Sequence, residues 1–227
     1  MTGKQLAVVV ASGGMDSCVA AAVALQSYDL AMFHLNYGQL TEARELRAFR
    51  DQAAFYKAKH ILEVDAGHFR QIGGSALTDR TLAVPDAKNL GKGVPVTYVP
   101  FRNANILAMA ISWAEVIGAV RVFIGAVEED SSGYPDCRES FIDAFNAAIR
   151  EGTRPGSGIS IEAPLLHLNK GQIVRRGLDL GAPLHLSWSC YQSEDAACGT
   201  CESCVLRLRG FSSAGATDPI RYVKRTS

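Results

Sequence analysis

The stretch Leu6-Ala7-Val8-Val9-Val10, followed by Ala11-Ser12-Gly13-Gly14-Met15-Asp16-Ser17, decides the fold. Its first five residues are apolar, rich in valine and do not alternate with polar residues. This pattern is typical of a strand buried on both faces of a parallel sheet. The two glycines then predict a turn into a helix over residues 16–28. A buried strand, a glycine turn and a helix in this order predict an α/β fold.

Strand and helix patterns continue to alternate along the rest of the chain. Between residues 73 and 95, glycines and prolines mark a long irregular excursion, and loops of this length in a compact domain tend to be functional. The alternation predicts a Rossmann-like, doubly wound parallel sheet that binds ligands outside the carboxyl ends of its strands. We expect strands at residues 30–35, 61–64, 96–99, 121–126 and 159–163, and helices at 46–56, 103–117, 141–150 and 170–180.

The composition is that of one ordinary globular domain. The chain has 227 residues, of which 48% are hydrophobic, and 23 Lys+Arg balance 23 Asp+Glu. This balance gives no electrostatic preference for nucleic acid or an anionic membrane. We expect a single domain over residues 1–227 that includes a small metal-binding segment at 188–210.

Hydrophobic segments are too short for a membrane span or a signal peptide. The longest apolar run covers residues 18–25, whereas a membrane helix needs roughly twenty apolar residues. The first apolar stretch ends at once in Ser12-Gly13-Gly14, before it reaches the ~7–15 residues of a signal sequence. We therefore expect a cytosolic protein.

The loop Ser12–Ser17 has the properties of a phosphate site. Backbone N–H groups and the helix dipole at a strand-to-helix junction favour an anion, and glycines let it approach the backbone. Asp16 can cap the helix or hold a Mg²⁺ ion that bridges phosphates. A plain glycine turn with a serine or aspartate cap is the alternative. The loop lacks the Gly-Lys-Ser/Thr ending of kinase-type phosphate loops, which disfavours direct phosphoryl transfer. The expected nucleotide-binding residues are Ala11, Ser12, Gly13, Gly14, Met15, Asp16, Ser17 and Cys18.

Four cysteines near the end of the sequence predict a metal site. They follow the pattern Cys190-x7-Cys198-x2-Cys201-x2-Cys204. Tetrahedral Zn²⁺ is the usual metal for four thiolates, and a site closed by four sulfurs is structural because it has no open position. An iron–sulfur cluster is also chemically possible, and disulfides are disfavoured in a reducing compartment. We expect one structural zinc ion per chain.

The motif Ser-Gly-Gly-X-Asp-Ser after the first strand resembles the pyrophosphatase loop of the family that cleaves ATP to AMP and pyrophosphate. Three further stretches are similar to the 7-cyano-7-deazaguanine synthases of the queuosine pathway within that family. They are Val99-Pro100-Phe101-Arg102-Asn103, Ser132-Gly133-Tyr134-Pro135-Asp136-Cys137-Arg138 and Ser189-Cys190-Tyr191. The resemblance implies ATP-dependent conversion of 7-carboxy-7-deazaguanine and ammonia, through an amide, to the nitrile. It also implies a homodimer. The chain departs from the family at Leu40, where a basic residue usually follows Tyr37-Gly38-Gln39, which argues against a phosphate or carboxylate contact from that loop.

Charged and aromatic residues in these stretches are candidates for substrate binding. The Asp136 carboxylate can accept from two adjacent donors of a guanine-like edge, with capping of the following helix as its alternative. Tyr134 could stack on the heterocycle or simply pack. Arg102 follows a predicted strand, which suits a contact with a carboxylate or phosphate, and a solvated arginine is its alternative. The expected substrate-binding residues are Arg102, Asn103, Tyr134, Asp136 and Arg138.

Lys170 is expected to contact phosphate. It opens a predicted helix, where a cation is unfavourable to the helix dipole unless an anion lies nearby. Asp16, Arg102 and Lys170 are therefore the expected catalytic residues.

The remaining cysteines and the histidines carry no assigned chemistry. Cys18 is expected in the core, and Cys137 is interpreted as a loop residue, with a nucleophile as its alternative. The sequence identifies neither a covalent nucleophile nor a general base. A tRNA sulfurtransferase and a zinc-stabilised nucleotide sensor without turnover remain as alternative functions. The five histidines are scattered without metal-ligand spacing: His34, His60, His68, His167 and His185.

Overall fold

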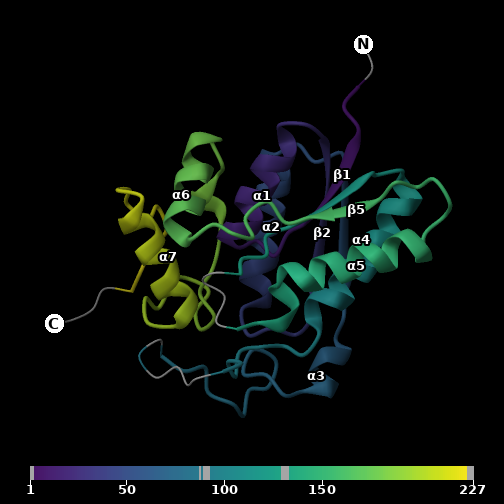
Figure 1. The fold of residues 1–227 in the computed structure, drawn as a ribbon. Coiled ribbons are helices and arrows are strands. Elements are labelled where there is room, and N and C mark those ends of the chain that lie inside the picture. The colour runs from purple at the N-terminus through teal and green to yellow at the C-terminus, as the bar shows by residue number, and fades with distance from the viewer. Residues whose placement is uncertain (1–2, 87, 89–92, 129–132, 224–227) are drawn as a thin grey trace.

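Five parallel strands form a single sheet at the centre of the computed structural model, which describes residues 3–86, 88, 93–128 and 133–223 (Figure 1). The spatial order is β3-β2-β1-β4-β5, and every neighbouring pair is parallel. The order reverses at β1, so the predicted doubly wound sheet is confirmed. The strands are β1 (Leu6–Val10), β2 (Asp29–Asn36), β3 (His60–Asp65), β4 (Arg121–Ile124) and β5 (Ser160–Glu162).

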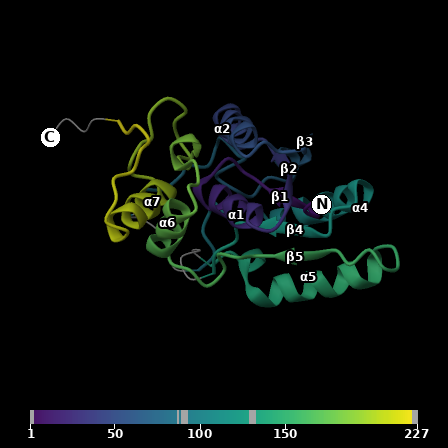
Figure 2. The ribbon, with the colours of Figure 1, turned by 90° about the horizontal axis from the view of Figure 1, so that it is seen from above.

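Helices cover both faces of the sheet. The α-helices are α1 (Met15–Leu25), α2 (Glu42–Phe55), α3 (His68–Ile72), α4 (Arg102–Ile117), α5 (Glu139–Gly152), α6 (Lys170–Asp179) and α7 (Glu202–Ser213). Short 3₁₀ turns precede α5 and follow α6: η2 (Pro135–Cys137) and η3 (Leu184–Leu186). Helix α5 runs beside β5, and α6 and α7 lie side by side to the left of the strands (Figure 2).

Strand β1 supplies apolar side chains to both cores, which explains its unalternating sequence. Val8 and Val10 pack into the core under α4 and α5, whereas Ala7 and Val9 pack into the core under α1, α2 and α6. All four are at most 9% exposed. The chain therefore places the glycine loop at the end of its most buried strand.

A buried ion pair holds the C-terminal part of the chain together. The Arg207 guanidinium of α7 donates to both carboxylate oxygens of Asp218, at 2.7 and 3.0 Å, and also to Ser187 Oγ at 2.7 Å. The two charged side chains are only 1% and 3% exposed. This pair fixes α7 against the segment that follows it.

The predicted strand at residues 96–99 is wrong. This segment forms a turn in which Tyr98 N donates to Pro95 O at 2.9 Å, while Val96 is 42% exposed. Strand propensity depends strongly on context, and these four residues pair with no strand of the sheet. Arg102 consequently begins a helix and does not follow a strand. Helices α3 and α7 were not expected from the sequence.

In the described part of the chain, no helix combines the length and apolar character required to cross a bilayer.

Candidate functional site

A cavity of about 270 Å³ opens outside the carboxyl ends of β1, β2 and β4. Its floor is formed by the glycine loop and by Gly125 to Val127 after β4. Its walls come from Tyr37, Arg102 and Lys170, and from Trp188 and Tyr191 of the C-terminal segment. The cavity therefore lies where an open parallel sheet binds its ligands.

Two glycines allow the loop to fit between its neighbours. Gly13 has a φ of 84°, and a Cβ there would collide with the backbone of Glu45. A Cβ on Gly125 would lie 2.7 Å from Ser17 N. Within the loop, Gly14 N donates to Ser12 Oγ and Ser17 Oγ donates to Gly14 O, both at 3.1 Å. The loop is thus held in one shape at the start of α1, as a phosphate site requires.

Asp16 and Lys170 both line the cavity and are in contact there, although they lie 154 positions apart in the sequence. Lys170 Nζ donates to Asp16 Oδ2 at 2.7 Å, and the side chains are 14% and 29% exposed. Asp16 Oδ1 is buried and has no hydrogen-bond partner among the described residues. Lys170 begins α6 as predicted, and Asn169 and Gln172 form a capping box in front of it. A cation and a carboxylate with a spare oxygen therefore lie beside the loop.

Arg102 also lines the cavity, next to an aromatic side chain. Its Nη1 donates to Tyr37 OH at 2.9 Å, and Cζ lies 5.1 Å from the centroid of the Tyr37 ring. Arg102 Nε is buried and, within the described residues, has no hydrogen-bond acceptor. The solvated-arginine alternative therefore does not describe this side chain. A buried N–H without an acceptor is ready to bind an anionic group of a ligand.

Asp136 lies behind the cavity wall and is 4% exposed. Its Oδ2 accepts a hydrogen bond from Asn103 N at 3.0 Å, and Asn103 Nδ2 donates to Asp136 O at 3.0 Å. Asn103 lines the cavity, but Asp136 is not among the lining residues. The geometry favours the capping alternative, although the helix capped is the preceding α4 and not the following α5.

The other residues of this motif differ in their access to the cavity. Tyr134 lines it, and its hydroxyl lies 2.8 Å from Thr97 Oγ1. Cys137 also lines it, but burial raises the pKa of this thiol to about 11, which opposes a nucleophilic role. Arg138 is exposed and lies outside the lining. Ser132 falls outside the described residues.

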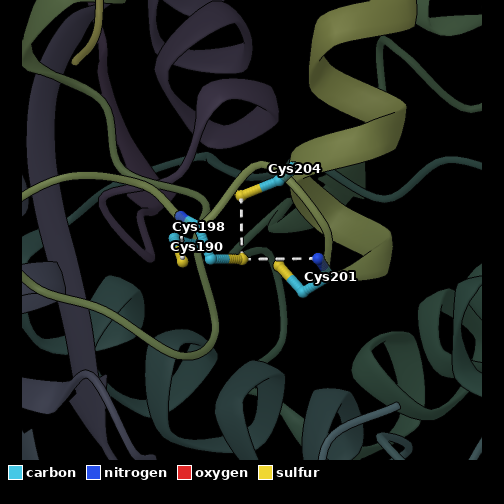
Figure 3. Close-up of side chains that lie close together, drawn as sticks. All are labelled: Cys190, Cys198, Cys201 and Cys204. Atoms are coloured by element: carbon cyan, nitrogen blue, oxygen red, sulfur yellow. Dashed lines mark hydrogen bonds between the residues drawn. The ribbon is translucent and has the colours of Figure 1, made fainter. Parts of the chain in front are cut away.

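The four cysteines converge as the spacing predicted. The sulfurs of Cys190, Cys198, Cys201 and Cys204 all lie within 4.8 Å of one another (Figure 3). Backbone N–H groups point at them: Cys198 N donates to Cys190 Sγ, and Cys201 N donates to Cys198 Sγ, each at 3.3 Å. N–H donors stabilise thiolates, so the cluster can hold a metal ion. It adjoins the cavity through Glu202, Ser203 and Tyr191.

Two residues of the predicted nucleotide segment do not line the cavity. Gly13 faces α2, and its carbonyl accepts from Gln52 Nε2 and Trp188 N. Cys18 is 0% exposed in the core, and burial raises its pKa to about 11, as expected for a core thiol. Leu40 also lies apart from the main cavity, and its N–H donates to Leu77 O at 3.1 Å.

Known proteins resemble this chain over nearly its whole length. The model of the family described as queuosine biosynthesis protein QueC matches residues 6–215. The chain belongs to this family. It is 57% identical to the 7-cyano-7-deazaguanine synthase of Chlorobium phaeobacteroides, with 96% of this chain and 97% of that protein covered. It is 56% identical to the 7-cyano-7-deazaguanine synthase of Koribacter versatilis, with 99% and 95% covered.

Several solved structures also resemble this chain. A predicted subunit of a tRNA methyltransferase from Methanocaldococcus jannaschii superposes with a TM-score of 0.47 at 12% identity, and covers 98% of this chain and 94% of its own.

Sequence reasoning missed cavity residues from the segment after β2, from α2 and from the segment after α3. Tyr37, Leu77 and Glu45 all line the cavity. The motif Tyr37-Gly38-Gln39 led to a prediction only for Leu40, the residue that follows it. Glu45 stands in a charged amphipathic helix, where nothing in the local pattern distinguishes it from a solvated carboxylate.

Proposed function

We propose that this protein converts 7-carboxy-7-deazaguanine, ammonia and ATP into 7-cyano-7-deazaguanine, a step of queuosine biosynthesis. The observation that carries the proposal is the 57% identity to a 7-cyano-7-deazaguanine synthase over 220 residues. The cavity supports it independently, because a glycine loop, a lysine and an arginine surround one space. In this reading the protein is a ligase that forms carbon–nitrogen bonds.

The triphosphate of ATP binds to the loop in the proposed reaction. Backbone N–H groups of the loop and Lys170 hold the phosphates, and Ser12 and Ser17 add hydroxyl donors. Asp16 Oδ1, which is buried without a hydrogen-bond partner among the described residues, would hold Mg²⁺, and this ion would neutralise phosphate charge. Lys170 shifts from Asp16 to phosphate when the nucleotide binds.

The deazaguanine substrate occupies the part of the cavity next to α4. Arg102 donates to its carboxylate and orients it toward the α-phosphorus. Asn103 and Tyr134 contact the heterocycle. The substrate carboxylate attacks the α-phosphorus and pyrophosphate leaves; ammonia then displaces AMP to give an amide. A second adenylation, on the amide oxygen, allows AMP to leave as the nitrile forms.

The four-cysteine cluster is proposed to hold one structural zinc ion. The four sulfurs close the coordination shell, so the ion would order the C-terminal segment that supplies Trp188 and Tyr191 to the cavity. We further propose that the protein acts as a homodimer, on the basis of the family resemblance, and that it acts on small molecules without a direct nucleic-acid partner.

Mass spectrometry of three reactions separates this function from its alternatives. The protein is incubated with ATP and one of three additions: 7-carboxy-7-deazaguanine with ammonia, unmodified tRNA with a sulfur donor, or buffer. Our proposal predicts nitrile and AMP in the first mixture only. Sulfur incorporation into tRNA would support the sulfurtransferase, and ATP binding without any product would support the sensor.

A further inference from the structure

Nitrile formation from ammonia requires a proton acceptor, a role that the binding functions proposed for Asp16, Arg102 and Lys170 do not supply. When ammonia displaces AMP, the new C–N bond forms, the C–O bond to AMP breaks, and the nitrogen loses one proton. During the second half-reaction the nitrogen loses its two remaining protons. The electron pair of the last N–H bond becomes the third C–N bond, while the C–O electrons leave with AMP.

Few side chains in the cavity can accept these protons. The described lining contains three carboxylates and no histidine. Asp16 is assigned to Mg²⁺ in the proposed reaction, and Glu202 directly follows the cluster residue Cys201 at the start of α7. Glu45 of α2 is the remaining carboxylate. We propose that Glu45 is the general base that removes protons from the substrate nitrogen, an inference that rests on the proposed function.

The position of Glu45 suits this role because its helix packs against the phosphate loop. The main chain of Glu45 lies so close to Gly13 that it leaves no room for a Cβ at position 13. In the reaction, one oxygen joins the substrate carbon to the α-phosphorus of the nucleotide in that loop. The nitrogen is bonded to the same carbon, so the proton is released in the space that Glu45 lines.

Neighbouring polar groups hold the carboxylate without using all of its acceptor positions. Gln39 Nε2 donates to Glu45 Oε2 at 3.1 Å, and Gln39 Oε1 accepts from Tyr37 N at 2.9 Å, which fixes the amide orientation. Thr41 Oγ1 donates to Glu45 Oε1 at 2.8 Å. A carboxylate has about four acceptor positions, so these two bonds leave room for a substrate N–H.

Thr41 can also accommodate the protonated form of Glu45. Its hydroxyl has a single proton but lies within reach of two acceptors, Glu45 Oε1 at 2.8 Å and Cys190 O at 3.2 Å. When Glu45 is ionised, Thr41 donates to it. When Glu45 is protonated, it can donate to Thr41 Oγ1, and Thr41 then donates to Cys190 O. The same set of atoms therefore satisfies both protonation states.

The electrostatic surroundings place the titration of Glu45 near neutral pH. Burial raises its pKa to about 7, against the opposing effects of hydrogen bonds from Thr41 and Gln39 and of the Arg102 charge. Glu42 on the same helix raises it further, and the Tyr37 hydroxyl, the other titratable group beside it, stays neutral because burial raises its pKa to about 12. A base that titrates near the working pH is the most effective kind.

The test starts from the amide intermediate, which isolates the second half-reaction, and measures nitrile formation against pH. In the wild type, kcat rises as Glu45 ionises, with an apparent pKa near 7, and is level at higher pH. Glu45→Gln should lower kcat about a hundredfold or more and abolish this acid limb, with KM for ATP unchanged. Asp51→Asn, an exposed change on the same helix, should match the wild type.

Four outcomes would overturn an assignment, and they differ in which assignment they overturn. A wild type that makes no nitrile from amide and ATP refutes the proposed function itself. A Glu45→Gln variant that retains the wild-type acid limb, or that changes only KM, refutes the role of Glu45 and leaves the proposed function standing. If Glu45→Gln does not fold, Glu45→Asp decides: a reduced kcat with the acid limb retained supports the base, and an unchanged kcat contradicts it.

Discussion

Replacement of Asp136 distinguishes a residue that caps a helix from one that forms a hydrogen bond with the substrate. In the structure this carboxylate is 4% exposed and accepts from Asn103 N at 3.0 Å, in the first turn of α4. Loss of a capping carboxylate to alanine costs about 0.5–2 kcal/mol. Because the bond is buried, we expect Asp136→Ala to lie near the upper value, about 2 kcal/mol. For a chain of this size, that lowers the melting temperature by roughly 4–8 °C.

Asparagine is the more informative substitution, because its amide oxygen can still accept from Asn103 N while the charge is lost. We expect Asp136→Asn to be less destabilised than Asp136→Ala, and to bind the deazaguanine substrate and ATP nearly as the wild type does. Differential scanning calorimetry gives the stabilities, and isothermal titration with each ligand gives the affinities. Asp143→Asn on the exposed side of α5 is the matched control, expected within about 0.5 kcal/mol of the wild type.

If Asp136 instead bound the substrate directly, the result would differ. Loss of a charge-assisted hydrogen bond to the substrate costs about 1.5–3 kcal/mol, equivalent to roughly ten- to a hundredfold in affinity. If Asp136→Asn keeps the wild-type melting temperature but loses that much substrate affinity while ATP binding is unchanged, the capping interpretation is wrong.

Four further substitutions test the loop, the cluster and the C-terminal ion pair. Asp16→Ala and Lys170→Met should each abolish AMP release while circular dichroism stays that of the wild type, and full activity in either would remove that residue from the site. Elemental analysis should find one zinc per chain, and the presence of iron, or active protein without metal, would contradict this. Structural zinc contributes about 10–16 kcal/mol of apparent binding free energy. Cys201→Ser should therefore unfold the C-terminal segment. Arg207→Met leaves the buried Asp218 carboxylate without its cation and should cost about 3–5 kcal/mol in urea unfolding; a loss below about 1 kcal/mol would show that the pair is not essential.

Features of the sequence that depend on local pattern were predictable. The buried run at β1, the glycine loop and the cysteine spacing each involve residues close together in the chain, and the structure has all three. Helix α6 was also expected, and its first residue is Lys170. Local propensity, turn chemistry and ligand spacing are sufficient for such elements.

Features that depend on distant partners were not predictable in the same way. The strand expected at 96–99 has the residue types of a strand, but in the fold it forms a turn and pairs with no strand of the sheet. The partner of Asp136 is Asn103, 33 positions earlier, and the pair between Asp16 and Lys170 spans 154 positions. Glu45 becomes a cavity residue only because α2 packs against the glycine loop. Such contacts are set by the topology of the sheet and not by sequence spacing.

The fate of the carboxylate oxygens tests the proposed chemistry most directly. 7-Carboxy-7-deazaguanine labelled with oxygen-18 at both carboxylate oxygens is converted with ammonia and ATP, and the products are analysed by mass spectrometry. Two successive adenylations on the substrate predict two AMP molecules per nitrile, each with one oxygen-18, and unlabelled pyrophosphate. Label in inorganic phosphate with ADP as the nucleotide product, or unlabelled AMP, would contradict adenylation of the substrate and with it the function proposed for this protein.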